Sequence, residues 1–194
     1  MLTRRCLVDR FTFKRVIATI SITVATIGRR FFWRENYVYF LRLLRYHLLT
    51  ADLDLLAYCL MPNHYHLLVK SQGGDISKGM QSVVLAYTKA INHRFDRSGS
   101  LFEGTFKAIE VSTSEYLCHL VRYIHLNPVK AGLVDRPEEW EFSSYPEYAD
   151  LRTGKLPKQE QVRSFFNSPV EWRSWLEDTR LPTLPQVRNL MFDE

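Results

Sequence analysis

The sequence predicts an α+β fold in which a ferredoxin-like, or RRM-like, antiparallel sheet carries helices packed on one face. The first observation is the order of residue patterns, because stretches with strand and helix periodicity follow one another as β-α-β-β-α-β-α. The second is the short turn Met61-Pro62-Asn63 between two apolar stretches, which predicts a central hairpin. The third is composition, since 46% hydrophobic and 24% charged residues are typical of a soluble globular protein.

The elements of the first half follow from local patterns. Residues 16–27 are apolar and rich in β-branched side chains, which predicts the first strand. A helix is predicted over residues 34–49, where apolar side chains recur at steps of three and four. Residues 53–60 and 64–70, on either side of the turn, are predicted as the second and third strands.

The second half continues with a helix over residues 76–95 and a fourth strand over residues 105–111. The last helix is expected to begin near Ser112 or Thr113, because either side chain can cap a helix N-terminus. Pro128 is expected to end this helix one residue earlier, since the residue before a proline disfavours helical angles.

The chain of 194 residues is long enough for one domain, or for one domain with an appendage. Residues 1–150 are predicted to form the domain. Residues 151–194 hold four prolines among charged residues and two tryptophans. We expect them to form a loosely attached tail that is partly helical, with one short helix around residues 170–178.

The N-terminal region has the outline of an export signal, since five basic residues precede the apolar run over residues 16–27. That run is too short to span a bilayer, is rich in β-branched residues and lacks a convincing small-x-small cleavage site. Three scattered cysteines without a CxxC pattern suit a reducing compartment. We therefore expect a cytoplasmic protein without a membrane partner, in which this run is a strand.

Charge is concentrated at the N-terminal quarter of the chain. The net charge is +5, and residues 1–50 carry ten lysines and arginines against two acidic residues, whereas the remainder carries sixteen against nineteen. This distribution indicates a localised surface for a polyanion. Its alternative is an ordinary solvated basic face, and charge alone does not decide between them.

Four side chains form the candidate catalytic site. His64 and His66 are separated by one residue on a predicted strand, so both imidazoles lie on the same face, as a shared metal ion requires. Tyr123 and Asn127 are four residues apart on a predicted helix and also share a face. Taken singly, each has an ordinary alternative: a packed strand histidine, a packed tyrosine, or an asparagine at a helix C-terminus.

These residue types suit metal-assisted attack on a phosphodiester. Neutral imidazole favours Mn²⁺ over Mg²⁺, which prefers oxygen ligands, and either ion is expected as the cofactor. A free tyrosine titrates near ~10, so the site must assist the nucleophile at neutral pH. His119, one helical turn before Tyr123, is a possible proton acceptor, although a packing histidine is the commoner case. Tyr87 has the spacing of a core residue, whereas Tyr116 lies on roughly the same helix face as Tyr123.

The chain resembles the REP-associated branch of the single-tyrosine HUH transposases, a group similar to the smallest bacterial insertion-sequence transposases. The match is strongest over residues 53–148. It rests on four motifs in the same order: AYCLMPNHYHLLV (57–69), RSGSLFEG (97–104), RYIHLNPVKAGLV (122–134) and WEFSSY (140–145). Several separated motifs in order are more specific than any one of them.

The resemblance implies an HUH nuclease fold and a transposase that cleaves single-stranded DNA near hairpins. Tyr123 would form a 5′-phosphotyrosine intermediate, and His64, His66 and Asn127 would hold the divalent metal ion. Consistent with strand transfer that needs no ATP, the sequence has no GxxxxGK[ST] phosphate loop. Two alternatives remain open: a metal hydrolase without a covalent intermediate, and a catalytically reduced hairpin-binding protein.

Basic residues near these motifs are the candidate DNA contacts. The resemblance implies a hairpin partner with a short single-stranded tag, bound by a monomer or homodimer that is nucleoid-associated when on DNA. The residues expected to hold backbone phosphates are Arg29, Arg30, Arg97, Lys107, Arg122 and Lys130.

Overall fold

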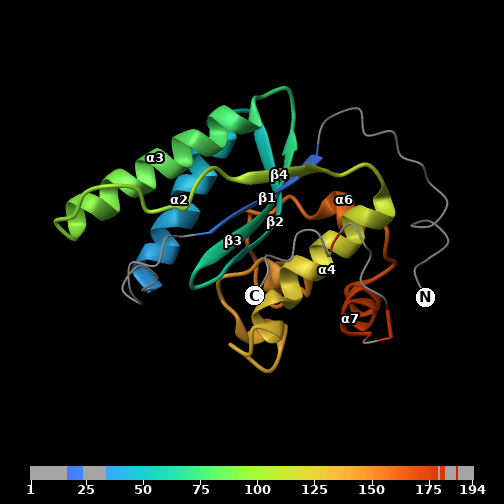
Figure 1. The fold of residues 1–194 in the computed structure, drawn as a ribbon. Coiled ribbons are helices and arrows are strands. Elements are labelled where there is room, and N and C mark those ends of the chain that lie inside the picture. The colour runs from blue at the N-terminus through green and yellow to red at the C-terminus, as the bar shows by residue number, and fades with distance from the viewer. Residues whose placement is uncertain (1–16, 24–33, 179, 182–186, 188–194) are drawn as a thin grey trace.

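The computed structural model describes residues 17–23, 34–178, 180–181 and 187. The elements that build the sheet and its helices are, in chain order, β1 (Ile17–Thr23), α2 (Arg34–Thr50), β2 (Leu53–Leu60), β3 (His64–Ser71), α3 (Ile76–Arg94), β4 (Lys107–Glu110) and α4 (Ser114–Lys130) (Figure 1). The chain continues through η1 (Pro137–Glu139), α5 (Tyr145–Tyr148), α6 (Glu160–Arg163) and α7 (Pro169–Glu177). No helix in these ranges is long and apolar enough to cross a membrane.

The four strands form one sheet in the order β2-β3-β1-β4, and every neighbouring pair is antiparallel. This is the strand order of a ferredoxin-like fold, so the predicted fold class is confirmed. The predicted strand over residues 16–27 is present as β1 over the residues described there, and residues 24–27 lie outside the described part. The fourth strand is shorter than expected.

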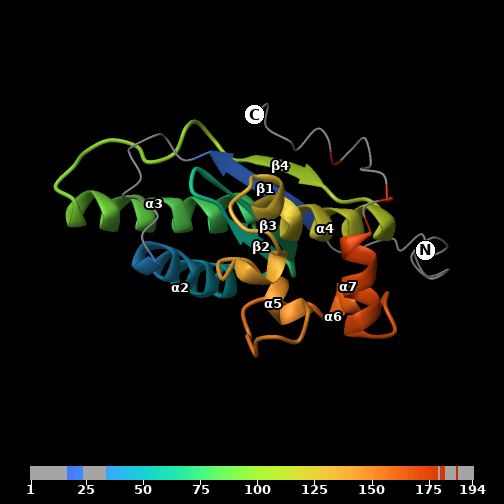
Figure 2. The same cartoon turned by 90° about the horizontal axis from the view of Figure 1, so that it is seen from below.

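Helices cover both faces of the sheet. α2 and α3 run side by side over one face, and α4 lies over the other with α7 beside it (Figures 1 and 2). The expectation of helices on one face holds for α2 and α3, and α4 adds a layer on the opposite face. The reason is that β2 and β3 carry apolar side chains on both faces, which form two separate buried clusters.

A β-bulge in β2 changes which of its residues face each cluster. Leu55 faces α2 and α3, and after the register shift between Leu55 and Ala57 the side chains of Tyr58 and Leu60 face the same way. A bulge adds one residue to the strand, so the alternation of faces resets. β3 has no shift, and His66 therefore faces α4 while its neighbour Tyr65 faces α2 and α3.

Side-chain caps begin α3 and α4. Asp75 accepts a hydrogen bond from the backbone N–H of Lys78 at 3.1 Å at the start of α3. Thr113 accepts one from the N–H of Tyr116, also at 3.1 Å, at the start of α4. Of the two predicted caps for the last helix, Thr113 rather than Ser112 is the one used.

The prediction that Pro128 ends the last helix is wrong, since α4 continues to Lys130. The carbonyl of Asn127 still accepts the N–H of Ala131 at 2.9 Å. A proline in the last helical turn loses only the bond to the carbonyl four residues earlier, here Ile124. Pro128 is itself buried, and its packing offsets that loss.

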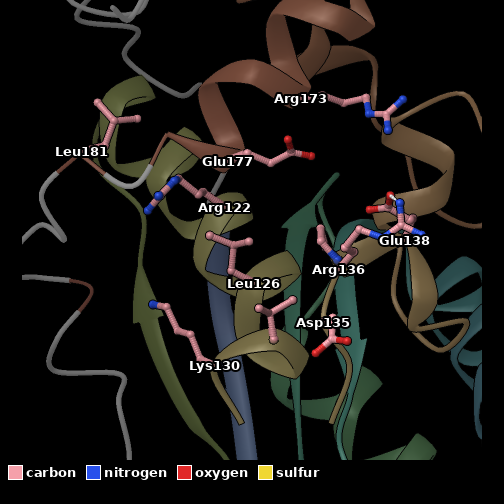
Figure 3. A pocket seen from close by; sticks show the side chains of 11 residues that line it. Arg122, Leu126, Lys130, Asp135, Arg136, Glu138, Arg173, Glu177 and Leu181 are labelled. Carbon is pink, nitrogen blue, oxygen red and sulfur yellow. Dashed lines mark ion pairs between the residues drawn. The ribbon is translucent and has the colours of Figure 1, made fainter. Parts of the chain in front are cut away.

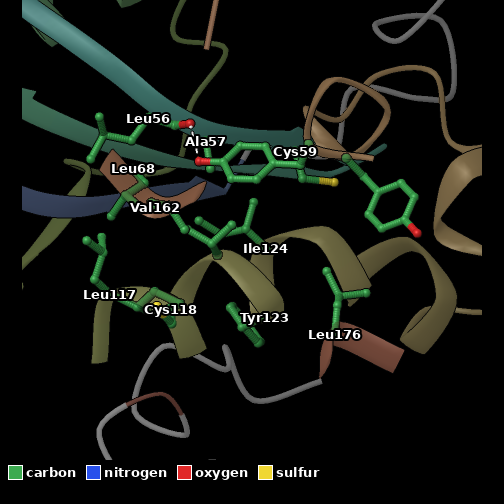
Figure 4. Packing of buried hydrophobic residues seen from close by; sticks show 14 of the residues in the cluster. Leu56, Ala57, Cys59, Leu68, Leu117, Cys118, Tyr123, Ile124, Val162 and Leu176 are labelled. Atoms are coloured by element: carbon green, nitrogen blue, oxygen red, sulfur yellow. Dashed lines mark hydrogen bonds between the residues drawn. The ribbon is translucent and has the colours of Figure 1, made fainter. Parts of the chain in front are cut away.

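Described residues after position 150 contribute to the core, whereas the composition suggested a loosely attached tail. The helix expected near residues 170–178 is α7, and its Trp172, Trp175 and Leu176 side chains are 1%, 4% and 0% exposed. They belong to the cluster formed by α4 and the sheet, where Leu176 flanks the α4 side chains (Figure 4). The division at residue 150 into a domain and a tail stays a prediction.

Candidate active site

The two histidines of β3 lie side by side on the sheet face that α4 covers. Their ring centroids are 4.8 Å apart and the ring planes meet at 76°. His66 is 1% exposed, and His64, at the first position of the strand, is half-buried. Strand alternation produces this pairing, as the sequence predicted.

α4 brings Tyr123 to these histidines. The centroid of the Tyr123 ring lies 5.2 Å from that of His66, with the planes at 70°. Figure 4 shows the helix beneath the sheet, with Ile124 directed at the strands and Tyr123 on a neighbouring side of the helix. The structure thus joins residues that are far apart in the chain.

Asn127 lies one turn further along α4 and is 5% exposed. Its Nδ2 donates a hydrogen bond to the Tyr123 carbonyl at 3.3 Å. With the amide nitrogen used in this way, Oδ1 is the atom that can act as a ligand. The ligand role of Asn127 stays a prediction.

Burial keeps one imidazole neutral, and a neighbour sets the tautomer of the other. Burial, and next the proximity of His64, lower the pKa of His66 to about 3, so this ring is uncharged at neutral pH. His64 Nδ1 lies 2.7 Å from Oδ1 of Asn63. An amide oxygen accepts only, so Nδ1 carries the proton and Nε2 has the lone pair. The sequence analysis did not single out Asn63, although it directly precedes the pair.

The donor set fits a divalent ion. Imidazole nitrogens are ligands for divalent transition-metal ions, and an amide oxygen is a ligand that Mn²⁺ and Mg²⁺ accept. No group of three or more His, Cys, Asp or Glu side chains that could hold a metal ion occurs in the part of the chain that the structure describes. The amide of Asn127 is therefore the donor that would complete a three-ligand set with the histidines.

Two of the predicted DNA-contact lysines lie beside this site. Lys130 is exposed, and its Nζ lies 5.1 Å from the centroid of the Tyr123 ring. Lys107 and His66 both pair with the Ser21 position of β1, one from each side. Directly paired residues point to the same face, so Lys107 shares the face of His66, with Cα atoms on the order of 10 Å apart.

The Arg122 side chain forms hydrogen bonds within the protein. Its Nε donates to the carbonyl of Leu176 at 2.8 Å, and its Nη2 donates to the carbonyl of Asp178 at 2.9 Å. The guanidinium is 9% exposed, and burial lowers its pKa. From the sequence, Arg122 was predicted to be a phosphate contact. Its actual partners are backbone carbonyls at the end of α7, and a backbone carbonyl cannot be recognised from residue types.

Of the other predicted arginines, the structure describes Arg97. Arg97 donates to Oδ1 of Asn92 at 2.7 Å and to the carbonyl of Ser100 at 3.4 Å, within the loop that follows α3. Arg29 and Arg30 lie outside the described residues.

Neighbouring residues take the roles of packing groups. The His119 ring meets that of Trp175 at 5.4 Å and 79°, and burial lowers its pKa. Tyr87 packs on Phe40 on the opposite side of the sheet, with centroids 4.9 Å apart, as its core spacing predicted. Tyr116 is buried in the cluster under α4, where burial raises its pKa.

A cavity of about 670 Å³ adjoins the site along α4. Its volume is within the range of ligand pockets, roughly 300–1,000 Å³. Figure 3 shows Arg122, Leu126 and Lys130 on one wall, from α4, and Arg173 and Glu177 on another, from α7. Lys130 lines this cavity and also lies beside the Tyr123 ring, whereas Tyr123 itself and the two strand histidines do not line the cavity.

The fold and site together define a ferredoxin-like protein with a histidine pair on the sheet and a tyrosine facing it from a third helix. Residues 18–127, more than half of the chain, match the family described as IS200-like transposase. The chain belongs to the IS200-like transposase family, a family of enzymes that cleave DNA. The resemblance that the sequence motifs indicated is confirmed.

One solved structure shares this fold, and a second is less similar. A REP-associated tyrosine transposase bound to a REP hairpin is 16% identical, with a TM-score of 0.63 over 77% of this chain and 92% of that one. A candidate transposase from Deinococcus radiodurans R1 is 17% identical, with a TM-score of 0.43 over 54% of this chain and 85% of that one. No curated protein matches the chain.

Proposed function

We propose that the protein is a metal-dependent endonuclease and strand transferase for single-stranded DNA, and that Tyr123 is its nucleophile. The observation that carries this proposal is the contact between the Tyr123 and His66 rings, 5.2 Å apart, with His64 beside them. Membership in a transposase family supports the reaction class. If these histidines and this tyrosine were independent packing residues, nothing would require them to lie in contact.

The reaction is a transfer between two phosphodiesters. The Tyr123 oxygen attacks the scissile phosphorus, its bond to phosphorus forms, and the bond to the 3′ oxygen of the preceding nucleotide breaks. The products are a 5′-phosphotyrosine and a free 3′-hydroxyl, which takes the proton lost by the phenol. A 3′-hydroxyl can later reverse this step on another strand, so the bond energy is retained.

Lys130 is placed to assist the nucleophile. At neutral pH only about one phenol in a thousand is ionised. An ammonium group near the ring stabilises the phenolate more than the phenol, because opposite charges attract. Its exposed position also lets it meet a backbone phosphate of the strand.

His64, His66 and Asn127 would hold the metal ion, Mn²⁺ or Mg²⁺. When bound, such an ion polarises the scissile phosphate and stabilises charge on the leaving oxygen. The chain's own contribution is to keep His66 neutral through burial and to orient His64 through Asn63.

The proposed substrate is a single strand next to a DNA hairpin, bound in the cytoplasm by a monomer or homodimer. The similar solved structure is described as bound to a REP hairpin, which supports this choice. Lys107 and Lys130 would meet phosphates of the single strand, and Arg29 and Arg30 those of the hairpin.

The test is a search for the covalent intermediate. Wild-type protein is incubated with end-labelled single-stranded hairpin DNA and Mn²⁺ or Mg²⁺, and the products are separated on a denaturing gel. We expect a protein–DNA band that Tyr123→Phe abolishes while DNA binding persists. Tyr87→Phe, which alters a tyrosine on the opposite side of the sheet, is the control and should keep the band.

The two other functions give different results in the same assay. A hydrolase that uses activated water would cleave without a covalent band and would survive Tyr123→Phe. A hairpin-binding protein without activity would give neither product. Either pattern in the wild-type protein contradicts the proposal.

A further inference from the structure

We propose that His125 and Ser144 form a positioning pair that holds the Tyr123-bearing helix at its working distance from the histidine strand. This inference rests on the proposed function, because it names the groups that align its nucleophile. Neither residue touches the reacting atoms. Both lie in motifs that the sequence analysis singled out, His125 in RYIHLNPVK and Ser144 in WEFSSY, and the proposed reaction assigns neither residue a role.

His125 lies two residues after Tyr123, so its side chain leaves α4 on roughly the opposite side of the helix. It is fully buried, and its Nε2 is 2.8 Å from Oγ of Ser144. The rings of Tyr145, Tyr148 and Trp172 surround the imidazole with centroids 4.9 to 6.0 Å away. The ring therefore has one polar contact, and that contact fixes its direction.

Ser144 continues this link to β2. Its backbone N–H donates to the carbonyl of Tyr58 at 2.9 Å, and its Oγ accepts the Tyr58 N–H at the same distance. The hydroxyl also donates to the Tyr58 carbonyl at 3.2 Å. Ser144 thus forms hydrogen bonds with both the backbone N–H and the backbone carbonyl of Tyr58, although Ser144 and Tyr58 are 86 positions apart in the chain.

Strand β2 is the direct neighbour of the histidine strand. Cys59, which follows Tyr58, is paired with His66 across the β2–β3 ladder. Hydrogen bonds therefore lead from α4 through His125 and Ser144 to Tyr58 of β2, whose chain neighbour Cys59 is the register partner of His66. The distance between the nucleophile and its metal-binding partner is set at the far side of the helix.

The hydrogen-bond capacity of Ser144 determines the state of the histidine. A serine hydroxyl has one proton and two acceptor positions. The proton goes to the Tyr58 carbonyl and one acceptor position to the Tyr58 N–H, which leaves the other for a proton on His125 Nε2. Nδ1 of His125 is buried without a hydrogen-bond partner among the described residues, and burial lowers the pKa of His125 to about 3. The hydrogen-bond pattern thus places the proton of a neutral His125 ring on Nε2.

A polar link in an aromatic enclosure favours a positioning role over a merely stabilising one. An apolar side chain would fill this enclosure without any desolvation cost, and buried polar pairs often contribute specificity of arrangement more than stability. A helix held by apolar packing alone can slide against a sheet. A small displacement of a nucleophile is costly, since about 1 Å can reduce a rate roughly a hundredfold.

The experiment compares His125→Leu, His125→Gln and Ser144→Ala with the wild type. We expect His125→Leu and Ser144→Ala to fold and to bind hairpin DNA and Mn²⁺ within about twofold, while single-turnover formation of the covalent band slows roughly tenfold or more. His125→Gln, whose amide nitrogen can replace Nε2–H, should recover most of the rate.

Val83→Ala, in the α3 cluster on the other side of the sheet, is the matched control for lost stability. It should lower the melting temperature and leave the rate at temperatures well below melting unchanged. The proposal is overturned if His125→Leu keeps the wild-type rate. It is also overturned if the rate follows the melting temperature in all variants without rescue by glutamine.

A second readout does not depend on DNA cleavage. 3-Fluorotyrosine placed at position 123 reports the surroundings of that ring, including His66, through its ¹⁹F resonance. We expect this resonance to shift or broaden in His125→Leu and in Ser144→Ala and to return in His125→Gln. An unchanged resonance in both defective variants overturns the positioning pair, whereas absence of a covalent band in the wild type overturns the proposed function alone.

Discussion

The rings of His66 and Tyr123 meet edge-on between β3 and α4, with centroids 5.2 Å apart and planes at 70°. This contact depends on two structural features: the register of β3 in the sheet, and the face of α4 that packs against the sheet. A slip of one residue in β3 would turn His66 away from α4, because strand side chains alternate. The site is therefore a consequence of sheet register.

Removal of either strand histidine should release the metal ion. We expect His66→Ala and His64→Ala to weaken Mn²⁺ binding at least about tenfold and to abolish cleavage, since each leaves only two protein ligands. Titration calorimetry with Mn²⁺, followed by the denaturing gel, measures both effects. His93→Ala, an exposed histidine of α3, is the control.

The same metal requirement predicts the effect of a chelator. Wild-type protein in chelator-treated buffer should lose cleavage and regain it when Mn²⁺ is added. Full cleavage by His66→Ala without added metal would refute this role of the strand histidines.

Stability should fall in mild acid because of two buried histidines. Burial lowers the pKa of both His66 and His125 to about 3, whereas a histidine in the unfolded chain titrates near ~6.5. Between these values the unfolded chain binds protons that the folded chain excludes. The stabilisation is fully present above pH ~6.5 and is lost as pH falls, by up to roughly 1.4 kcal/mol per pH unit for each histidine.

Urea unfolding between about pH 7 and about pH 5 measures this slope. His125→Gln removes one of the two groups, so its free energy of unfolding should depend on pH less steeply by up to one proton. Equal slopes for the variant and the wild type would show that His125 binds a proton as readily when folded as when unfolded.

Lys130 should set the pH range of the nucleophile. Its Nζ lies 5.1 Å from the Tyr123 ring, where a positive charge favours the phenolate. We expect Lys130→Met to move the alkaline rise of the cleavage rate to higher pH and to slow the reaction about three- to tenfold at neutral pH, the equivalent of roughly 1 kcal/mol. Rate measurements across pH with saturating DNA test this.

Lys89→Met removes an exposed lysine of α3, in the other layer, and serves as the control. If both variants show the same pH profile, the ammonium of Lys130 does not act on Tyr123.

Local patterns in the sequence predicted the parts of the site but not all of their surroundings. The alternation of β3 gave a shared face for His64 and His66, and helical spacing gave one for Tyr123 and Asn127. The end of α4 was predicted wrongly at Pro128, because burial offsets the bond that proline loses. Sequence rules for proline account for the lost hydrogen bond, but they do not account for the burial of the Pro128 ring.

Hydrogen bonds between side chains and distant backbone groups could not be predicted from the sequence. The partner of His125 is Ser144, which forms hydrogen bonds with Tyr58, and no spacing rule joins these three positions. Prolines and charges in the C-terminal segment suggested loose attachment, yet Trp172 is 1% exposed. Aromatic residues there carried the opposite signal, since large aromatic side chains dominate buried cores.

Arg122 and Lys107, both predicted to hold phosphates, should behave differently on substitution. Arg122 donates two hydrogen bonds to carbonyls at the end of α7 and is 9% exposed, whereas Lys107 is exposed at the start of β4. We expect Arg122→Met to reduce the free energy of unfolding by about 1–3 kcal/mol, because two buried carbonyls lose a charged donor. Its DNA affinity should keep the wild-type dependence on salt.

Lys107→Gln should show the reverse pattern. Its stability should stay within about 0.5 kcal/mol of the wild type, as for most surface substitutions. The logarithmic dependence of single-stranded DNA affinity on salt should become shallower by about 0.7, the value for one phosphate contact on a single strand. Binding titrations at several salt concentrations and urea unfolding of both variants measure the four quantities. If Arg122→Met makes the salt dependence of DNA affinity shallower and leaves stability unchanged, Arg122 contacts a DNA phosphate and the prediction is contradicted.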